Sequence, residues 1–269
     1  YGCDGGVDYG SFYTMRSGTA AFYDKTLESG TVFVSGPRSG CTNSIIPACG
    51  VLNVPYYYEG CTCSYPLPSA LTLVSMPEYH EQWATWGKSR PEQIQRIGIN
   101  FGAPGDRKTR DGTLWLEYPS AGGPSPELDV SVAPQNTTAH YRHSLFAAGG
   151  RGWPWVYSSS VAGLESFTLR KLKPGRYTVR LFFAETLQAK AGERLQDVFV
   201  GKKRVAGALD IVTGAGGPLR GLVLELDEVE LDDTFTLRLS SIRGRTLLSG
   251  IELIASGLDR ARVPVVKLR

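Results

Sequence analysis

The stretch from Tyr177 to Asp210 constrains the fold of this chain more than any other. Every second residue from Tyr177 to Phe183 is apolar, and this period of two is typical of a half-buried β-strand. A polar loop follows and ends at Gly192-Glu193-Arg194. The run Asp197–Val200, the turn Gly201-Lys202-Lys203 and a second run from Val205 then predict a hairpin. The stretch therefore predicts antiparallel sheet.

Composition extends this prediction to the whole chain. The 269 residues are 42% hydrophobic, enough for a substantial core, and the 32 glycines and 16 prolines favour many short strands joined by turns. We therefore predict an all-β protein. The net charge of +3 is spread along the chain with no basic block among aromatics, which argues against a nucleic-acid partner. No apolar run approaches the roughly 20 residues of a membrane helix, so we expect no membrane span.

All five cysteines lie early in the chain, and they are Cys3, Cys41, Cys49, Cys61 and Cys63. Zinc sites usually need Cys-x2-Cys knuckles and four ligands, and Cys61-Thr62-Cys63 is too tight for one, so disulfides are favoured over metal. Two bridges with one thiol left over can be made in 15 ways, counted as 5 × 3, and the sequence does not choose among them. Disulfides imply an oxidising compartment, which means the periplasm, the cell surface or a secreted protein.

Several separate phrases resemble the malectin-like domain, a carbohydrate-binding β-sandwich. They are RIGINFGAPGDRKTRDGTLWLEYPSAGGPSPEL from Arg96, WPWVYSSSVAGL from Trp153, FFAE, GER, DVFV, GKKRV and LDIV between Phe182 and Val212, and LLSGIELI from Leu247. The resemblance covers residues 94–256 and implies a jelly-roll of two antiparallel sheets. Period-two patterning in this region independently predicts strands at 128–132, 167–169, 222–226 and 235–239.

Residues 1–76 predict an antiparallel β-meander with strands at 12–16, 20–24, 31–34, 51–54 and 70–74. The phrases RSGTAAFYD, GPRSGCTNSIIPACGVLNVP and CTCSYPLPSALTL resemble the closing part of PQQ-type β-propellers of large bacterial surface or periplasmic proteins. That resemblance implies a blade-like tail of a propeller, completed by an upstream part or by another protein chain. The alternative is a small disulfide-stapled β-domain that is complete in itself.

Two connecting segments complete the predicted organisation. Residues 77–93 are expected to form a linker, in which one helical turn would place Trp83 and Trp86 on a shared face. Residues 257–269 are expected to form an extended C-terminal tail whose apolar part, Val263–Leu268, could add to a neighbouring sheet edge. The chain opens at Tyr1 without a methionine or signal peptide, so we expect a processed or recombinant product or a fragment.

Groups that could carry catalysis are few. A glycosidase needs two carboxylates facing a cleft, and the acids near the hairpin are Glu185, Glu193, Asp197 and Asp210. We favour structural ion pairing for them, with Arg194 paired to Asp197 or Glu185. Asp106 and Asp111 are candidates for a structural calcium site, with a solvated turn as the default. We predict no catalytic residues and no other cofactor.

Sugar binding needs an aromatic face beside polar groups. In the run Thr113–Tyr118, Trp115 alternates with apolar residues and is expected on the polar, exposed face, which makes it a candidate together with Tyr118. A second aromatic segment supplies the further candidates Trp153, Trp155 and Tyr157. The alternative is that these rings cover the ends of the sandwich.

The sequence thus predicts a non-catalytic, extracytoplasmic module that binds a glycan or cell-surface polysaccharide, or serves adhesion or assembly within a larger protein. The rival hypothesis is the C-terminal part of a propeller enzyme, such as a quinone-dependent dehydrogenase. Upstream sequence would discriminate the two, because the enzyme requires a full set of propeller repeats with cofactor ligands.

Overall fold

The computed structural model describes residues 5–17, 19–28, 30–34, 45–55, 70–260, 262 and 265–266. The regular elements of the described chain are almost all β-strands, with two short α-helices and one 3-10 turn. It divides into two compact units. The first comprises Tyr1–Glu78 and Gln82–Trp86, and the second comprises Tyr79–Glu81 and Gly87–Arg269.

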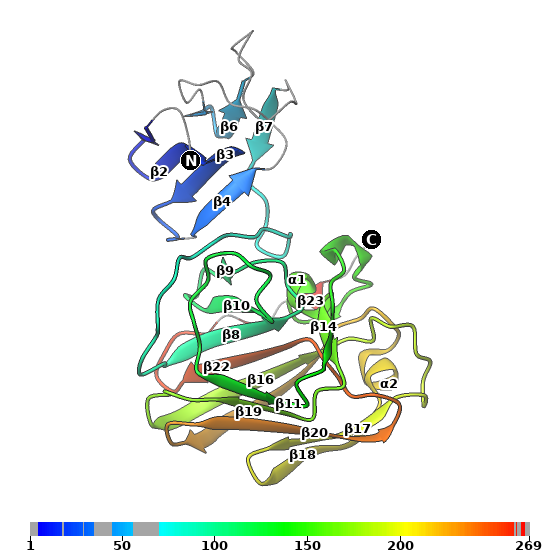
Figure 1. The fold of residues 1–269 in the computed structure, drawn as a ribbon. Coiled ribbons are helices and arrows are strands. Elements are labelled where there is room, and N and C mark those ends of the chain that lie inside the picture. Colours follow the sequence, from blue (N-terminus) through cyan, green and yellow to red (C-terminus); the bar gives the residue numbers. More distant parts are fainter. Residues whose placement is uncertain are drawn as a thin grey trace. The chain divides into compact units, whose positions relative to one another are not determined.

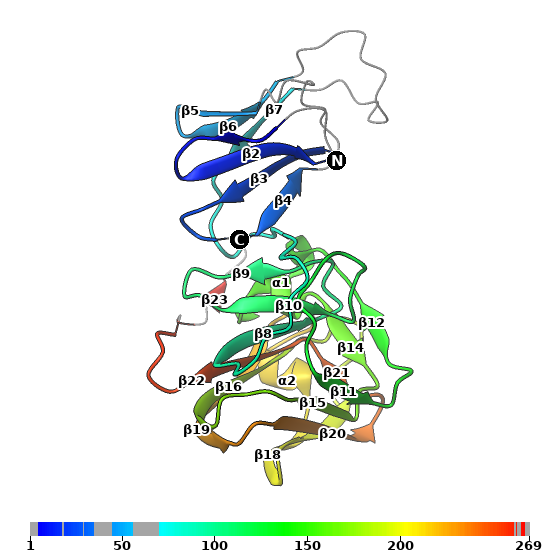
Figure 2. The same ribbon diagram turned by 60° about the vertical axis from the view of Figure 1, so that its left-hand side comes forward.

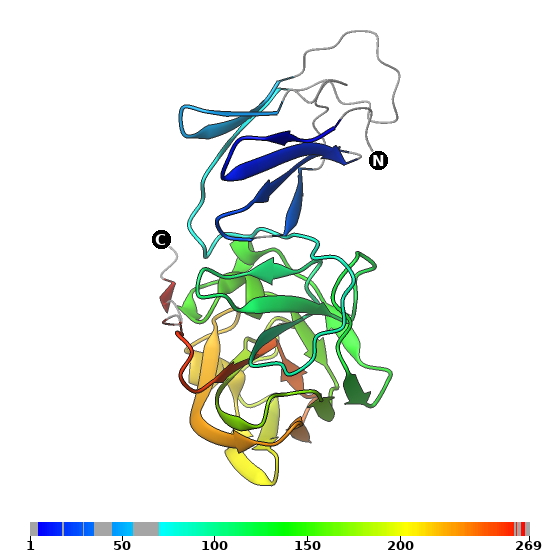
Figure 3. The ribbon, with the colours of Figure 1, turned by 90° about the vertical axis from the view of Figure 1, so that its left-hand side faces the viewer.

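The first unit contains two antiparallel sheets, seen in blue and cyan in Figure 3. The strands run in the order β1-β2-β3-β4 in one sheet and β5-β6-β7 in the other. Their bounds are β1 Val7–Asp8, β2 Phe12–Ser17, β3 Thr19–Asp24, β4 Thr31–Val34, β5 Ile46–Ala48, β6 Val51–Val54 and β7 Leu71–Val74. The five strands predicted here are confirmed, whereas the short β1 and β5 were not predicted. Ala20 from one sheet and Leu52 and Val54 from the other share one small core with Ile45.

The segment predicted as a helical turn around Trp83 and Trp86 is extended instead, so that prediction is wrong. Thr85 forms an isolated antiparallel bridge with Thr31, with both backbone hydrogen bonds at 3.0 Å. The neighbouring Trp86 ring lies against Gly30, where a Cβ atom would come within 2.5 Å of the ring. Gly30 also has a φ of +74°, a conformation that favours glycine. Backbone pairing to the edge of β4 therefore outweighs local helix formation.

The second unit is a β-sandwich whose layers are a six-stranded sheet, β19-β16-β22-β8-β10-β9, and a five-stranded sheet, β11-β15-β20-β17-β18 (Figure 1). The bounds of the first sheet are β8 Arg96–Phe101, β9 Arg107–Lys108, β10 Leu114–Tyr118, β16 Gly175–Phe183, β19 Leu222–Leu231 and β22 Gly250–Ala255. Those of the second are β11 Val130–Ala133, β15 Ser166–Leu169, β17 Leu195–Val200, β18 Lys203–Leu209 and β20 Phe235–Arg243. The predicted jelly-roll sandwich and its strands are confirmed.

Smaller elements close the ends of the sandwich. A three-stranded sheet has the order β12-β14-β21, and β13 pairs with β23. The bounds are β12 Thr138–His140, η1 Ser144–Phe146, β13 Gly150–Arg151, α1 Pro154–Tyr157, β14 Ser160–Ala162, α2 Ile211–Ala215, β21 Leu247–Leu248 and β23 Val265–Val266.

The core of the sandwich lies between its two large sheets. β16 contributes Tyr177, Val179, Leu181 and Phe183 to it, and all four are fully buried. The Tyr177 hydroxyl donates to the carbonyls of Ile94 and Lys173 at 2.9 and 2.6 Å, which satisfies its polar atom inside the core. The period-two pattern of this strand therefore marks the face that packs on the second sheet.

β16 is nevertheless buried on both faces, so the prediction of a half-buried strand is wrong. Phe182 packs against the ring of Trp115, with the ring centres 5.3 Å apart. Arg180 is 4% exposed and forms ion pairs with Glu225 at 2.6 Å and Glu252 at 3.1 Å. Because a polar side chain can be buried when it is paired, alternation alone did not identify the covered outer face.

The structure differs from the sequence-based expectations at two further places. The large sheet is not wholly antiparallel, because β10 lies parallel to β8 after the chain has formed the edge strand β9. The C-terminal tail does not stand unpaired, because Val265–Val266 forms an antiparallel pair with Gly150–Arg151 of the same chain. The short helix α1 lies beside the strands β9 and β10 (Figure 2).

Of the predicted disulfide cysteines, Cys3, Cys41, Cys61 and Cys63 lie outside the described residues. Cys49 is exposed, and its thiol is free. Among the described residues, the helices are too short to cross a membrane.

Candidate functional site

Trp115, the first sugar-binding candidate, is a packing residue. Its side chain is 1% exposed, so the expectation of exposure is wrong. The ring lies edge-on to the rings of Trp155 at 5.5 Å and Phe182 at 5.3 Å. It covers Gly98 of the neighbouring strand, where a Cβ atom would come within 2.1 Å of the ring. The ring thus belongs to a second aromatic layer on the outer face of the six-stranded sheet.

The second candidate segment supplies the cover of this layer. Pro154–Tyr157 forms α1, all four of whose residues are buried, and Pro at its first position suits a helix start. The Trp153 and Trp155 rings stack at 5.8 Å, and the Arg107 guanidinium lies 4.4 Å from the centre of the Trp155 ring. The Tyr157 hydroxyl donates to the Gly149 carbonyl at 3.0 Å, and burial raises its pKa.

Tyr118, the fifth candidate, is half-buried. Its ring packs edge-on against Phe101 at 5.8 Å and Phe167 at 6.0 Å, which belong to the two opposing sheets. All five predicted rings therefore make packing contacts: four are buried, and Tyr118 is half-buried.

The two calcium candidates have separate partners. A carboxylate oxygen of Asp106 accepts from the Glu117 amide at 3.2 Å and the Ser125 hydroxyl at 2.9 Å. Asp111 accepts from the Thr109 hydroxyl at 2.5 Å and lies 3.8 Å from Arg96. Within the described ranges, no three His, Cys, Asp or Glu side chains gather as metal ligands would.

The acids near the hairpin are held in ion pairs and caps. Arg194 donates to Glu185 at 2.7 Å, which confirms one of its two predicted partners, whereas Asp197 pairs with Arg204 at 3.5 Å. Asp210 caps α2 by accepting from the amides of Val212 and Thr213. These hydrogen bonds hold the Asp210 pKa below its usual value, although desolvation opposes them and is the largest single effect. The carboxylates therefore stabilise the loops at this end of the sandwich.

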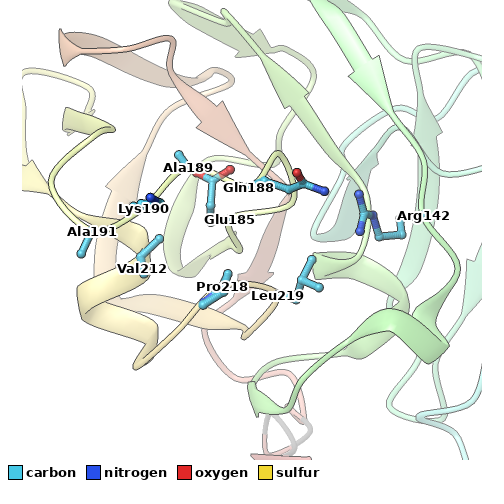
Figure 4. Close-up of a pocket in the computed structure, with 9 residues that line it drawn as sticks. All are labelled: Arg142, Glu185, Gln188, Ala189, Lys190, Ala191, Val212, Pro218 and Leu219. Carbon is cyan, nitrogen blue, oxygen red and sulfur yellow. The ribbon is translucent and has the colours of Figure 1, made fainter.

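Those loops enclose an open cavity of about 430 Å³. It lies between the loop after β16, the segment around α2 and the loop before η1 (Figure 4). We call it the end cavity. The residues that line it are Arg142, Glu185, Gln188, Ala189, Lys190, Ala191, Val212, Pro218 and Leu219.

The loop Tyr141–Phe146 contributes Arg142 to the end cavity and carries exposed apolar side chains. Tyr141 is 50% exposed, Leu145 77% and Phe146 60%. The Arg142 guanidinium, which lines the cavity, lies 5.6 Å from the centre of the Phe146 ring. Large side chains exposed to this degree contribute little to a core and leave apolar surface on which a ligand can pack.

Glu81 holds this loop in place. One of its carboxylate oxygens accepts from the Tyr141 hydroxyl, and the other accepts from the Ser144 amide at 2.7 Å and lies 3.2 Å from His143 Nδ1. The His143 side chain in turn accepts from the Leu145 amide and caps η1. The exposed rings are therefore presented on an anchored loop.

The opposite walls of the cavity are tied together by backbone hydrogen bonds. The Leu219 amide donates to the Glu185 carbonyl at 3.0 Å, and the Leu219 carbonyl accepts from the Ala148 amide at 2.7 Å. Gln188, at the rim, has a φ of +67°, a strained value for a residue with a side chain. The cavity is thus a formed feature of the loops, with a polar amide held at its mouth.

A second cavity, of about 720 Å³, lies where β11, β15 and β20 meet their loops. It is more polar, with Glu165, Arg238 and Arg245 among its lining residues, and its lining contains no aromatic side chain. Each cavity has a lining arginine beside a ring, but Phe199 beside Arg238 is half-buried, whereas Phe146 beside Arg142 at the end cavity is 60% exposed.

Sequence reasoning did not select the residues of the end cavity. Tyr141, Leu145 and Phe146 lie outside any period-two run, and their only signal is a cluster of large apolar side chains before the small residues Ala147–Gly150. Trp115 carried the stronger signal and proved to be buried.

Known proteins share the sandwich with this chain. The family model described as Malectin domain matches residues 97–254. None of the curated proteins matches the chain.

Solved structures that resemble the chain do so at low identity. β-Glucuronidase 2 of Bacteroides uniformis matches with a TM-score of 0.48 and 15% identity over 88% of this chain and 27% of its own. The plant receptor-like kinase ANX2 matches with a TM-score of 0.47 and 14% identity over 76% of this chain and 60% of its own. The ANXUR2 extracellular domain from Arabidopsis thaliana matches with a TM-score of 0.41 and 15% identity over 60% of this chain and 41% of its own.

The chain therefore spans less than two thirds of each of these structures. The family match covers more than half of its 269 residues, from the first strand of the sandwich to the last. This chain belongs to the Malectin domain family.

Proposed function

We propose that the chain is a non-catalytic carbohydrate-binding module and that the end cavity holds the sugar. The observation that carries this proposal is the exposed Phe146 ring beside Arg142, whose guanidinium lines the cavity together with the amide of Gln188. The apolar face of a pyranose packs on an aromatic ring, while its hydroxyls need hydrogen-bond partners. Gln188 and Arg142 supply such partners at the rim.

The open form of the site suits binding of a chain end or a branch. The cavity is large enough for one or two sugar units by the usual size of small-molecule sites, which is about 300–1,000 Å³. Its walls are fixed by backbone hydrogen bonds and by Glu81, so little ordering entropy is lost on binding.

We propose further that the module works outside the cytoplasm as part of a larger protein or assembly, in adhesion or glycan capture. In this proposal residues 1–76 are the tail of a propeller, 77–93 a linker, 94–256 the binding sandwich and 257–269 a C-terminal tail. The cysteine-rich start of the chain and its propeller-like phrases support this context.

Glycan-array binding of the purified chain tests the proposed function, followed by calorimetry on the best ligand. Phe146→Ala should lower the affinity for that ligand by about threefold to tenfold, which corresponds to the usual contribution of an aromatic contact to the binding free energy. It should leave the melting temperature nearly unchanged, because the ring is 60% exposed.

Tyr9→Ala is the matched control, because Tyr9 is an exposed aromatic residue in the β1–β2 turn of the first unit. This variant should bind normally. Absence of binding to any glycan, or equal affinity of Phe146→Ala and the parent chain, would contradict the proposal.

A further inference from the structure

We infer that the end cavity selects a sugar that carries a carboxylate, with Arg142 as the group that contacts the anion. This inference rests on the proposed function and names the class of glycan. It starts from the ionisable lining residues, which are two bases, Arg142 and Lys190, and one acid, Glu185.

The charge of Glu185 is already compensated inside the protein. One carboxylate oxygen accepts from Arg194 Nε at 2.7 Å and the other accepts from the Leu187 amide at 2.8 Å. The side chain has no exposed surface. Glu185 therefore supports the wall and offers a ligand no free negative charge.

The neighbouring acids are likewise engaged with the backbone. Asp210 accepts from the amides of Gly192, Val212 and Thr213, and Glu193 accepts from the Lys190 amide at 2.8 Å. Neither acid lines the cavity. The charge presented to a ligand is therefore net positive.

Arg142 is the base best placed to use that charge. In the described part of the chain its guanidinium has the Phe146 ring as its neighbour and no carboxylate within ion-pair distance. Figure 4 shows the Gln188 amide extending toward it across the mouth of the cavity. A guanidinium matches a carboxylate with two parallel N–H···O bonds, and a ring beneath it holds its plane.

Lys190 adds a second cationic contact from the other side of the cavity (Figure 4). Its ammonium group also has no carboxylate partner among the described residues. A neutral sugar would leave both cations partly desolvated without a counter-charge, which costs free energy. A uronic acid bound in the cavity with its carboxylate at Arg142 and its ring beside the exposed edge of Phe146 removes that cost.

The experiment compares acidic glycans with their carboxyl-reduced forms. An array carries uronic-acid oligosaccharides, the same oligosaccharides after reduction of each carboxyl to a primary alcohol, sulfated glycans and neutral glucans. We expect the uronic-acid oligosaccharides to bind about tenfold or more tightly than their reduced forms. Their affinity should fall as salt is raised from 0.05 to 0.5 M, on the order of severalfold, while any neutral binding stays constant.

Variants assign the effect to the cavity. Arg142→Gln should reduce the affinity for the uronic-acid ligand about tenfold and reduce the affinity for its reduced form much less, because a glutamine amide still hydrogen-bonds a hydroxyl but carries no charge. Lys202→Gln removes the same charge from the turn between β17 and β18, outside the cavity lining, and should change neither affinity. A melting curve of each variant confirms that the fold is intact.

The outcomes separate the inference from the proposed function. Equal binding of the acidic and reduced glycans, a preference for neutral or only sulfated glycans, or full acidic-glycan affinity in Arg142→Gln would overturn the carboxylate assignment while leaving a sugar-binding module. Absence of binding to the whole array would overturn both.

Discussion

Arg194 Nε donates a hydrogen bond of 2.7 Å to Glu185, a carboxylate with no exposed surface. Arg194 also donates to the Arg245 carbonyl, and Glu185 also accepts from the Leu187 amide. One ion pair thus fixes the loop after β16, the start of β17 and the turn before β21. The wall of the end cavity depends on this pair.

Arg194→Met should therefore be strongly destabilising. It leaves the Glu185 carboxylate buried without its cation, a loss that usually costs about 3–5 kcal/mol of unfolding free energy. Urea denaturation of the variant and the parent chain measures this difference in unfolding free energy. Arg170→Met is the control, because its pair with Asp129 is about half exposed, and it should cost less than about 1 kcal/mol. A double variant with Glu185→Gln should cost less than the sum of the single changes, and strict additivity would show that the pair is not coupled.

Trp115→Ala should lower stability rather than act only on ligand binding. The ring is 1% exposed and packs against Trp155 and Phe182, and truncation of such a ring costs about 3–5 kcal/mol. Chemical denaturation of the variant checks this. A melting temperature within about 1 °C of the parent chain would contradict the packing role, since such a cost shifts a domain of this size by several degrees.

The strands of the sandwich could be predicted from the sequence, because period-two patterning marks a face that packs on another sheet. That signal identified β16, β15 and β20 through residues such as Leu181 and Phe167, which are fully buried. It did not reveal the burial of the outer face. Thr113 and Glu117 lie two residues before and two residues after Trp115 and are polar, yet both are buried. Thr113 donates to buried Glu252 at 2.9 Å, and Glu117 accepts from the Ser120 hydroxyl at 3.0 Å.

The candidate site was predicted less well for the same physical reason. Whether an aromatic ring is core or ligand contact depends on what covers it, and the cover of Trp115 comes from α1, some 40 residues along the chain. Phe146 is 60% exposed, but no local pattern in the sequence predicts that its ring stays uncovered. The ion pair of Arg194 could be narrowed to two partners, because opposite charges near one hairpin leave few choices.

Cys49 should be the free thiol of the five cysteines. Its thiol is exposed and unpaired in the described structure. If the predicted two disulfides form, they join Cys3, Cys41, Cys61 and Cys63 in one of three arrangements instead of 15. Alkylation of the native chain without reductant, followed by peptide mapping, should label Cys49 alone. Labelling of all five thiols, or of a different single cysteine, would contradict this prediction.

Asp106 should make stability depend on pH. Burial raises its pKa from 3.8 to about 6, the nearby charge of Glu117 adds to the shift, and the hydrogen bonds from Ser125 and the Glu117 amide oppose it. The other carboxylate oxygen is buried with no hydrogen-bond partner among the described residues, which favours the protonated acid. The fold therefore binds this proton more tightly than the unfolded chain does.

The direction of the pH dependence follows from the linkage between proton binding and folding. The stabilisation is fully present below pH 3.8, the unfolded value, and is lost as the pH rises through about 6. A shift of this size corresponds to roughly 3 kcal/mol. Asp106→Asn keeps a neutral acceptor for Ser125 and the Glu117 amide, so the variant should gain stability relative to the parent chain as the pH rises from 4 to 7, by about 1–3 kcal/mol.

Denaturation at each pH, with the difference taken between parent and variant, isolates this group from the other acids. Asp232→Asn, in the exposed turn between β19 and β20, is the control and should show a nearly constant difference. If Asp106→Asn instead loses stability relative to the parent chain as the pH rises, Asp106 is ionised in the fold and the ionised form makes favourable contacts. Its unpartnered oxygen would then require a cation or an ordered water beside it.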